Sequence, residues 1–361
     1  MQEHLHHRPG VGERSGVRLA QLTTLRVGGP ARRLLEARCE EALVRAIADA
    51  DHAGEPVLVI GGGSNLVVGD EGFAGAVVRV ATRGVSLTGV GERVRLAVAA
   101  GEPWDELVAA TVADGLAGIE CLSGIPGLVG ATPIQNVGAY GQQVADTIAS
   151  VRAYDRHERR VVKLTGAECA FGYRTSALRR SDRHVVLGVT FELERSPLGH
   201  PLRYAELARA LGAQPGARLP LADVREAVLR LRRGKGMVLD PSDADSVSAG
   251  SFFVNPLLAP DELEALVCRS RERGCGEPPA WPEGEDAVKT SAAWLIERAG
   301  FQRGLTDGRV GISAKHTLAL VNRGGASTAE LLALARRIRD GVQATFGVAL
   351  APEPTLVGVE L

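Results

Sequence analysis

The chain has 361 residues, of which 45% are hydrophobic, so it is long and apolar enough for two or three domains with cores of their own. Its formal net charge of −1 gives no electrostatic footprint for nucleic acid. No apolar run approaches the ~18 residues that span a bilayer, and the N-terminus lacks the apolar stretch of a secretory signal. We therefore expect a protein that binds neither nucleic acid nor membranes. We also expect a cytoplasmic monomer.

The cysteines and the N-terminal histidines bear on metal binding and on the compartment. An odd number of cysteines without CxxC spacing argues against a disulfide framework and against a zinc site. The five are Cys39, Cys121, Cys169, Cys268 and Cys275. The polar residues 1–19, which include His4, His6 and His7, are expected to form a disordered tail. We expect no bound metal and a reducing compartment.

Hydrophobic periodicity and capping residues predict the regular elements in chain order. The first half contains a helix at 40–53, strands at 56–60, 76–80 and 94–99, a helix at 103–114 and strands at 147–154 and 160–164. The second half contains a strand at 184–193, helices at 221–233, 260–273 and 291–299, a strand at 317–321 and a helix at 328–342. Strands and helices interleave, which predicts an α/β or α+β class. A change of composition at residues 234–243 indicates a domain boundary.

A glycine-rich turn follows the strand at 56–60 directly. It reads Gly61, Gly62, Gly63, Ser64, Asn65. Consecutive backbone N–H groups of such a turn can point into one concavity that suits a pyrophosphate. Extended chain and not a helix follows at 66–68, so the turn is not a Rossmann motif. Taken alone, it could equally be an ordinary turn between two strands.

A second glycine-rich segment covers residues 123–141. Its aliphatic content favours a packed, ordered loop over a disordered linker. Gln135 and Asn136 offer paired amide groups suited to the edge of a pyrimidine-like ring. Two such segments about sixty residues apart suit one extended dinucleotide better than two unrelated turns.

Three shorter motifs complete the pattern. They are residues 171–174 (Phe-Gly-Tyr-Arg), residues 249–256 (Ala-Gly-Ser-Phe-Phe-Val-Asn-Pro) and residues 352–354 (Pro-Glu-Pro). Individually, each fits a turn, a core pair or a surface charge. Together with the two glycine-rich segments they resemble the UDP-N-acetylenolpyruvoylglucosamine reductase family, also called UDP-N-acetylmuramate dehydrogenases. The resemblance runs from about Thr23 to Leu361, and the runs 134–141 and 250–253 are its most specific parts.

The resemblance implies a two-lobed vanillyl-alcohol-oxidase-type FAD-binding fold with a C-terminal α+β substrate-binding domain. It places lobe 1 at 20–88 with the returning segment 345–361, lobe 2 at 89–236 and the substrate domain at 237–344. The implied reaction is NADPH-dependent reduction of UDP-N-acetylglucosamine enolpyruvate through FAD, in bacterial peptidoglycan precursor synthesis. Neither glycine-rich segment contains a histidine, so FAD is expected to bind non-covalently.

The resemblance also assigns residues. Those assigned to FAD are Gly61, Gly62, Gly63, Ser64, Asn65, Ile125, Pro126, Gly127, Gly130, Ala131, Gln135, Asn136, Gly138, Ala139 and Tyr140. Ser251 matches the proton donor, and Arg174 and Glu353 match its two companions. The residues assigned to the substrate are Tyr204, Lys235, Asn255 and Arg174. Tyr204 matches the tyrosine loop of one subclass, and Lys315 with His316 is a further candidate polar pair.

Two alternatives stay open at this point. A flavin oxidase of the same superfamily would reoxidise rapidly with oxygen and would not need Ser251. A non-catalytic nucleotide-sugar-binding protein would be colourless. The four tyrosines of the whole chain leave little material for a phenol pocket, and the set Arg174, Ser251 and Glu353 argues for catalysis.

Overall fold

The computed structural model describes residues 11–89, 91–179, 181–284 and 286–361. These residues form two compact units. Unit 1 takes the described residues of Met1–Val17, Ala31–Gly62 and Phe73–Arg233, and unit 2 takes Arg18–Pro30, Gly63–Gly72 and Gly234–Leu361. The division into three parts that the sequence suggests stays a prediction. The histidines His4, His6 and His7 lie outside the described residues.

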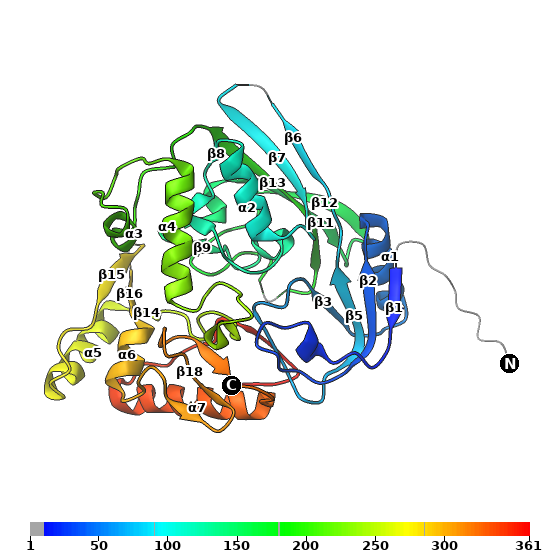
Figure 1. Ribbon diagram of the computed structural model, residues 1–361. Coiled ribbons are helices and arrows are strands. Elements are labelled where there is room, and N and C mark those ends of the chain that lie inside the picture. Colours follow the sequence, from blue (N-terminus) through cyan, green and yellow to red (C-terminus); the bar gives the residue numbers. More distant parts are fainter. Residues whose placement is uncertain (1–10, 90, 180, 285) are drawn as a thin grey trace. The chain divides into compact units, whose positions relative to one another are not determined.

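The first sheet of unit 1 is mainly parallel. Its order is β1 (Val11–Arg14), β2 (Ala31–Ala37), β5 (Phe73–Val80), β3 (Val57–Ile60), and only β1 runs antiparallel to its neighbour. Helix α1 (Glu40–His52) packs against this sheet through Leu43 and Ile47, one turn apart on its buried face (Figure 1). The strand β1 corrects one expectation: the disordered tail predicted for residues 1–19 does not extend over residues 11–14.

The second sheet of unit 1 is antiparallel. Its order is β12 (Arg160–Thr165), β11 (Ile148–Asp155), β13 (His184–Arg195), β7 (Arg93–Ala99), β6 (Val85–Thr88), and β8 (Leu116–Ala117) pairs with β13. Along β7, Val94, Leu96 and Val98 are buried and the residues between them are exposed, which is the alternation expected of a strand with one core face. Helix α2 (Trp104–Ala113) begins at a buried Trp104, whose indole Nε1 donates to the Leu122 carbonyl at 3.0 Å.

The rest of unit 1 consists of short elements around helix α4 (Leu221–Gly234). Helix α3 (Ala205–Ala210) and the hairpin of β9 (Gly138–Ala139) and β10 (Gln142–Gln143) belong to this region. Val224 and Val228 of α4 form a small apolar cluster with Leu202 and Leu207, and Tyr140 packs against it. Short 3₁₀ helices occupy Glu120–Leu122, Val129–Ala131 and Val144–Asp146.

Unit 2 joins chain segments that are far apart in sequence. Strand β4 (Leu66–Val68) pairs in parallel with β20 (Thr355–Val357). Two three-stranded sheets follow the orders β14 (Leu257–Leu258), β16 (Ala287–Thr290), β15 (Ala280–Glu283) and β17 (Thr306–Asp307), β18 (Val310–Ile312), β19 (Leu320–Asn322). The 3₁₀ helices Leu19–Gln21 and Ala244–Ser246 complete its strands and turns.

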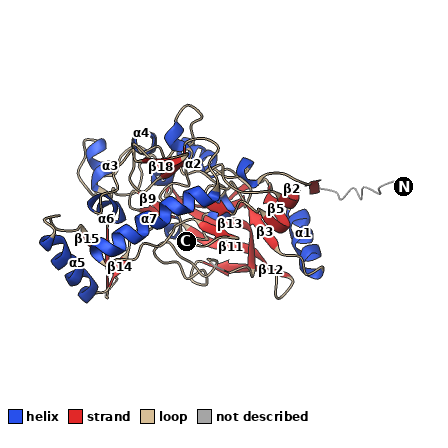
Figure 2. Ribbon diagram, turned by 90° about the horizontal axis from the view of Figure 1, so that it is seen from below, coloured by secondary structure: helices blue, strands red, loops and turns tan. Residues whose placement is uncertain are grey.

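Helix α7 (Thr328–Phe346) is the longest helix among the described residues and organises unit 2. It contacts α5 (Pro260–Glu272), α6 (Ala292–Arg298) and β18 (Figure 2). Ser327 caps its start with a capping box to Glu330, and Gly347 ends it in the left-handed conformation at φ +73°. The Asp70 carboxylate accepts hydrogen bonds from the backbone N–H groups of Thr328 and Ala329, which neutralises the positive end of the helix dipole.

The predicted elements are found with small differences at their ends. Helix α7 continues to Phe346 and does not stop at residue 342, and the strand expected at 317–321 is β19. Helix α3 and the strands β1, β2, β6, β8, β9, β10, β14, β15, β16, β17, β18 and β20 were not predicted, and β4 was predicted only as extended chain. In the described part of the chain, no helix has both the length and the apolar character needed to cross a bilayer.

Candidate functional site

The two glycine-rich segments touch each other in unit 1. An ideal Cβ on Gly62 would lie 2.9 Å from the Cα of Gly127, and one on Gly61 would lie 3.5 Å from Leu128 Cδ1. A side chain at position 62 would therefore force the segments apart. That the two segments serve one extended ligand stays a prediction. The glycine turn is divided between the units after Gly62, so Gly63 belongs to unit 2. Gly63 has φ +62°, and a Cβ there would overlap the Leu22 carbonyl.

The segment 123–141 is an ordered ledge rather than a linker. The backbone of residues 100–104 holds it: Trp104 N donates to Gly127 O at 3.0 Å, and Gly130 N donates to Ala100 O at 2.9 Å. A Cβ on Gly130 would lie 2.5 Å from the Cβ of Ala100, so close packing explains that glycine. The sequence alternative of a disordered linker is excluded.

The side chain of Asn136 forms hydrogen bonds with the protein around the ledge. Its Nδ2 donates to Gln143 Oε1 at 2.9 Å and to the Gly172 carbonyl at 3.0 Å, and its Oδ1 accepts from Ala145 N at 3.1 Å. Both amide hydrogens are used, so the Asn136 side chain has no donor left for a cofactor, and only a second lone pair on Oδ1 remains. Gln135 is also buried. Asn136 adopts φ +44°, a left-handed conformation that asparagine tolerates better than most residues.

Arg174 is presented by a tight turn. Gly172 and Thr175 exchange backbone hydrogen bonds at 3.1 and 3.3 Å, and Arg174 takes φ +49° between them. A Cβ on Gly138 would lie 3.6 Å from Arg174 Nη1, so the guanidinium lies against the ledge. The Asn136 bond to Gly172 fastens the turn to the same ledge. Unit 1 thus brings Arg174 beside the residues assigned to the flavin ring.

Arg232 is a charged neighbour of this site that the sequence analysis missed. It lies in the last turn of α4 with only 8% of its surface exposed. Burial lowers the pKa of its guanidinium to about 10, and the charge of Arg174 acts in the same direction, whereas Tyr140 and Asp105 act against it. The helical period could have revealed Arg232, because Val224, Val228 and Arg232 follow one another at four-residue spacing on the buried face.

Asp105 fastens the start of the ledge. Its carboxylate accepts from Gly124 N at 2.6 Å and forms a two-point ion pair with Arg225 at 2.6 and 3.0 Å. Burial raises the pKa of Asp105, but the Arg225 hydrogen bond and the Gly124 N–H outweigh it, so the pKa is lowered overall. The carboxylate therefore ties α2, α4 and the ledge together.

Tyr204 reaches the ledge from the segment before α3. Its ring meets the ring of Tyr140 edge to face, with centroids 5.6 Å apart and an interplanar angle of 88°. Burial raises the pKa of Tyr140 to about 12 and also raises the pKa of Tyr204, so both phenols stay protonated at neutral pH. With 45% of its surface exposed, Tyr204 remains accessible to a ligand.

Unit 2 brings Ser251 and Glu353 onto neighbouring segments. Glu353 N donates to Phe252 O at 2.9 Å, and Val254 N donates to Ala351 O at 3.1 Å, so residues 252–254 run antiparallel to 351–353. The same stretch includes Asn65 of the glycine turn: Asn65 Nδ2 donates to the Glu353 carbonyl at 3.4 Å, and Asn65 O accepts from Thr355 N at 2.9 Å. Arg174 belongs to unit 1 and these three residues belong to unit 2.

The remaining assigned residues of unit 2 are held individually. Asn255 Oδ1 caps α6 by accepting from Ala292 N at 3.0 Å. Lys315 Nζ pairs with Asp243 at 2.8 Å, and His316 Nδ1 accepts from Leu318 N at 3.1 Å. Lys235 is half-buried next to Gly236, which has φ +65°. Within the described ranges no cluster of three His, Cys, Asp or Glu side chains could hold a metal ion.

Comparison with known proteins gives concordant matches over both units. The model of the UDP-N-acetylenolpyruvoylglucosamine reductase C-terminal domain matches residues 240–357, and that of an FAD binding domain matches residues 31–164. The UDP-N-acetylenolpyruvoylglucosamine reductase of Thermobifida fusca is 57% identical over 348 residues, 96% of this chain and 98% of that protein. The one of Streptomyces coelicolor is 57% identical over 349 residues, 95% of this chain and 90% of that protein. The crystal structure of the reductase from Thermus caldophilus matches with a TM-score of 0.66 at 28% identity, covering 96% of this chain and 98% of that one.

Proposed function

Because the chain belongs to the UDP-N-acetylenolpyruvoylglucosamine reductase family, we propose that Arg174, Ser251 and Glu353 carry out its reaction. The protein is an FAD-dependent oxidoreductase with a mixed α+β fold of the vanillyl-alcohol-oxidase type and a C-terminal α+β region. Its reaction is the NADPH-dependent reduction of UDP-N-acetylglucosamine enolpyruvate to UDP-N-acetylmuramate, a step of peptidoglycan precursor synthesis.

The glycine-rich segments fit FAD. The backbones of Gly62 and Gly127 approach so closely that a Cβ at position 62 would clash with Gly127, and glycines without side chains leave the backbone of both segments open to a flat, charged ligand. Residues 61–65 would hold the pyrophosphate through backbone N–H groups, and residues 125–140 would hold the ring system. When bound, FAD supplies the hydride chemistry, with NADPH as the source of the hydride.

Arg174 stabilises the negative charge that forms on the substrate, and Ser251 then neutralises it by donating a proton. Hydride addition to the terminal methylene carbon leaves negative charge on the adjacent carbon and its carboxylate. The Arg174 guanidinium stabilises that charge as a fixed cation, and the Ser251 hydroxyl then donates a proton to the carbon. Glu353 polarises the same intermediate. The observation that carries this proposal is the pairing of Glu353 N with Phe252 O, which supports joint action of Ser251 and Glu353.

The substrate's diphosphate needs donors and a cation. Lys235 supplies a compact charge, the Tyr204 hydroxyl donates a hydrogen bond, and Asn255 donates through Nδ2, since its Oδ1 caps α6. On the match of Tyr204 we assign the chain to the subclass with a tyrosine loop. The protein works as a cytoplasmic monomer without nucleic-acid partners, and its product supports cell shape and cell division.

The test uses the purified protein without oxygen. We expect a flavin absorption spectrum that NADPH bleaches and that UDP-N-acetylglucosamine enolpyruvate restores stoichiometrically. Recovery only on admission of oxygen would indicate an oxidase, and a colourless protein that binds no added FAD would indicate a nucleotide-sugar-binding protein. Either result would overturn the proposal.

A further inference from the structure

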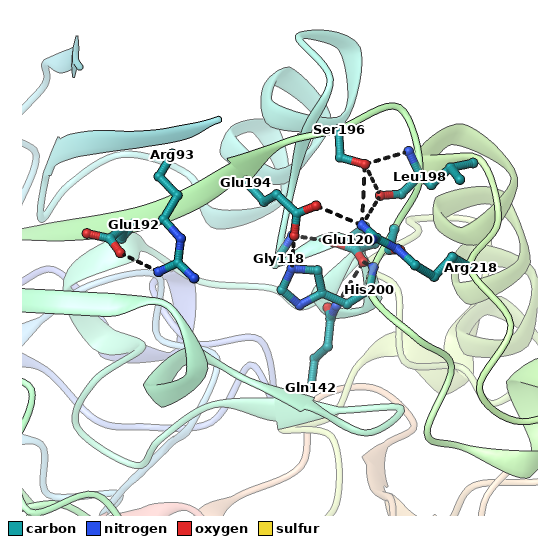
Figure 3. A network of polar contacts seen from close by, with 11 residues as sticks. Arg93, Gly118, Glu120, Gln142, Glu192, Glu194, Ser196, Leu198, His200 and Arg218 are labelled. Carbon is teal, nitrogen blue, oxygen red and sulfur yellow. Dashed lines mark hydrogen bonds and ion pairs between the residues drawn. The ribbon is translucent and has the colours of Figure 1, made fainter. Parts of the chain in front are cut away.

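Glu120 is a buried carboxylate that the reaction does not use. It opens the 3₁₀ helix Glu120–Leu122 and has 1% of its surface exposed. Both of its oxygens accept hydrogen bonds: Oε2 from Gly118 N at 2.7 Å, and Oε1 from Gln142 Nε2 at 2.9 Å and from His200 N at 2.8 Å (Figure 3). Burying a carboxylate is costly unless hydrogen bonds of this kind compensate it.

Two of the three donors, Gln142 and His200, come from segments that also carry residues assigned to ligands. Gln142 stands two residues after Tyr140 in the β9–β10 hairpin, and its Oε1 also accepts from Cys121 N at 2.8 Å. His200 stands four residues before Tyr204. Glu120 therefore joins the hairpin that carries one tyrosine of the edge-to-face pair to the segment that carries the other.

The segment around His200 is fastened on its other side as well. Gly199 N donates to Leu219 O at 2.8 Å, Leu202 N donates to Ala217 O at 3.0 Å, and Arg218 Nε donates to Gly199 O at 2.9 Å. A Cβ on Gly199 would lie 2.8 Å from Glu120 Oε1, so the backbone runs directly against the carboxylate. The base of the Tyr204 segment is thus fixed.

The space between the hairpin and this segment is not filled. A cavity of about 260 Å³ lies there, lined by Cys121, Tyr140, Gly141, Gln142, Asp146, His200, Pro201 and Arg203. The two segments touch beyond it through the close approach of Gly141 to Arg203 and through the tyrosine pair. On the near side of this cavity, the hydrogen bonds of Glu120 are the link that holds the two segments together.

We propose that Glu120 is a positioning residue that fixes Tyr204 against Tyr140 and thereby sets the affinity for the nucleotide-sugar substrate without touching it. The proposal rests on the role given above to Tyr204. Glu120→Gln places an amide NH₂ among N–H donors and removes an acceptor, so the bridge fails while the volume is kept. Losing a buried hydrogen bond to a charged group corresponds to about a tenfold change or more.

The experiment measures KM and kcat for UDP-N-acetylglucosamine enolpyruvate in E120Q, in Y204F and in the double variant. We expect E120Q and Y204F each to raise KM by about tenfold with kcat and FAD content little changed, and E120Q to add nothing in the Y204F background. Glu194→Gln is the matched control. Glu194 pairs with His200 and Arg218 on the same network but does not contact the hairpin, so KM should not change.

The outcomes separate the proposal from its premise. If Y204F leaves KM unchanged, the role of Tyr204 fails and the role of Glu120 fails with it. If Y204F raises KM but E120Q does not, or if the two effects simply add, only the role of Glu120 is overturned. Should E120Q not fold, Gln142→Met cuts the same bridge from the hairpin side, and the same non-additivity with Y204F is required.

Discussion

Unit 1 and unit 2 each contain a residue assigned to catalysis, and in each unit a residue with left-handed backbone lies at or next to it. The two units differ in which residue adopts that conformation. In unit 1 the left-handed position is Arg174 itself, at φ +49°. For a residue with a side chain this conformation costs about 1 kcal/mol or more. In unit 2 it is Gly250, at φ +70°, which leaves the next residue, Ser251, at a negative φ. Glycine adopts this region at little cost.

The difference indicates that unit 1 needs a side chain at the left-handed position itself, whereas unit 2 does not. In the turn at 172–175, Arg174 lies against Gly138 in the left-handed conformation. Hydrogen bonds from Asn136 and Arg179 to the turn hold it there. Non-glycine residues that persist in such conformations concentrate at functional sites. Ser251 needs no strain, because paired extended segments hold its neighbours Phe252 and Val254.

The largest expected effect is on turnover, and it tests the residue that unit 2 contributes, Ser251. Ser251→Ala removes the hydroxyl that we propose as the proton donor, and loss of such a donor usually slows turnover by about 10²–10⁴-fold. Bleaching of the flavin by NADPH should keep its rate, because that half-reaction needs no proton from Ser251. Rapid-mixing absorbance measurements follow both half-reactions, and Ser242→Ala, an exposed serine of the same unit, is the control. Near-normal turnover in S251A would contradict the role.

A second prediction concerns the glycine contact of unit 1. Gly62→Ala puts a Cβ 2.9 Å from the Gly127 Cα, which is main chain and cannot yield as a flexible side chain would. We expect FAD to bind about tenfold more weakly, a change of ~1.4 kcal/mol, by fluorescence titration of the apoprotein. Gly12→Ala is the control, because nothing lies within 4 Å of a Cβ there. Equal FAD affinity in G62A and wild type would show that this contact does not shape the cofactor site.

A reciprocal pair of variants tests the contrast between the backbone conformations of Arg174 and Gly250. Gly250→Ala should lower the free energy of unfolding by about 1 kcal/mol, and this is a pure backbone effect, since no atom lies within 4 Å of the new Cβ. Arg174→Gly should raise it by about 0.5 kcal/mol, since relief of the left-handed strain exceeds the extra freedom of glycine in the unfolded chain. Chemical denaturation measures both. Equal signs for the two variants would refute the contrast drawn here.

The smallest expected effect tests the cap of α7. The backbone N–H of Ser327, followed by Arg309, lowers the pKa of Glu330 to about 2. A lowered pKa in the folded state gives stability that is complete above the ordinary value of about 4.3 and is lost as the pH falls toward 2. Glu330→Gln should therefore melt below wild type at pH 7, and the two melting temperatures should converge near pH 2. If the difference between the two melting temperatures does not depend on pH, the charge of Glu330 does not contribute to the stability of the cap.

Local signals explain what could be predicted from the sequence. The ends of α7 carry their own markers, Ser327 and Gly347, and the alternation along β7 fixes its core face. Glycine is the only residue that lets backbones touch as Gly62 and Gly127 do, so clustered glycines predicted close approach without any knowledge of the partner.

Other features have no local signal. The pairing of β4 with β20 joins two three-residue strands from opposite parts of the chain, and no periodicity encodes it. Glu120 is a single acidic residue beside Cys121 and Leu122, and its donors Gln142 and His200 become its neighbours only in the fold. The amide of Asn136 was predicted to serve a ligand, but counting donors in a sequence cannot reveal that the loop uses them itself.

The parallel pair of β4 and β20 has a consequence for the order of synthesis. Val68 and Thr355 are about 290 residues apart, and ribosomes add ~5–20 residues per second, so β4 leaves the ribosome roughly 15–60 s before its partner exists. Unit 1 ends at Arg233 and has all its strands by then. Asn65, whose side chain bonds to the Glu353 carbonyl, has to wait for the last residues. The glycine turn is therefore made early, but its neighbour Glu353 is added only when translation is almost complete.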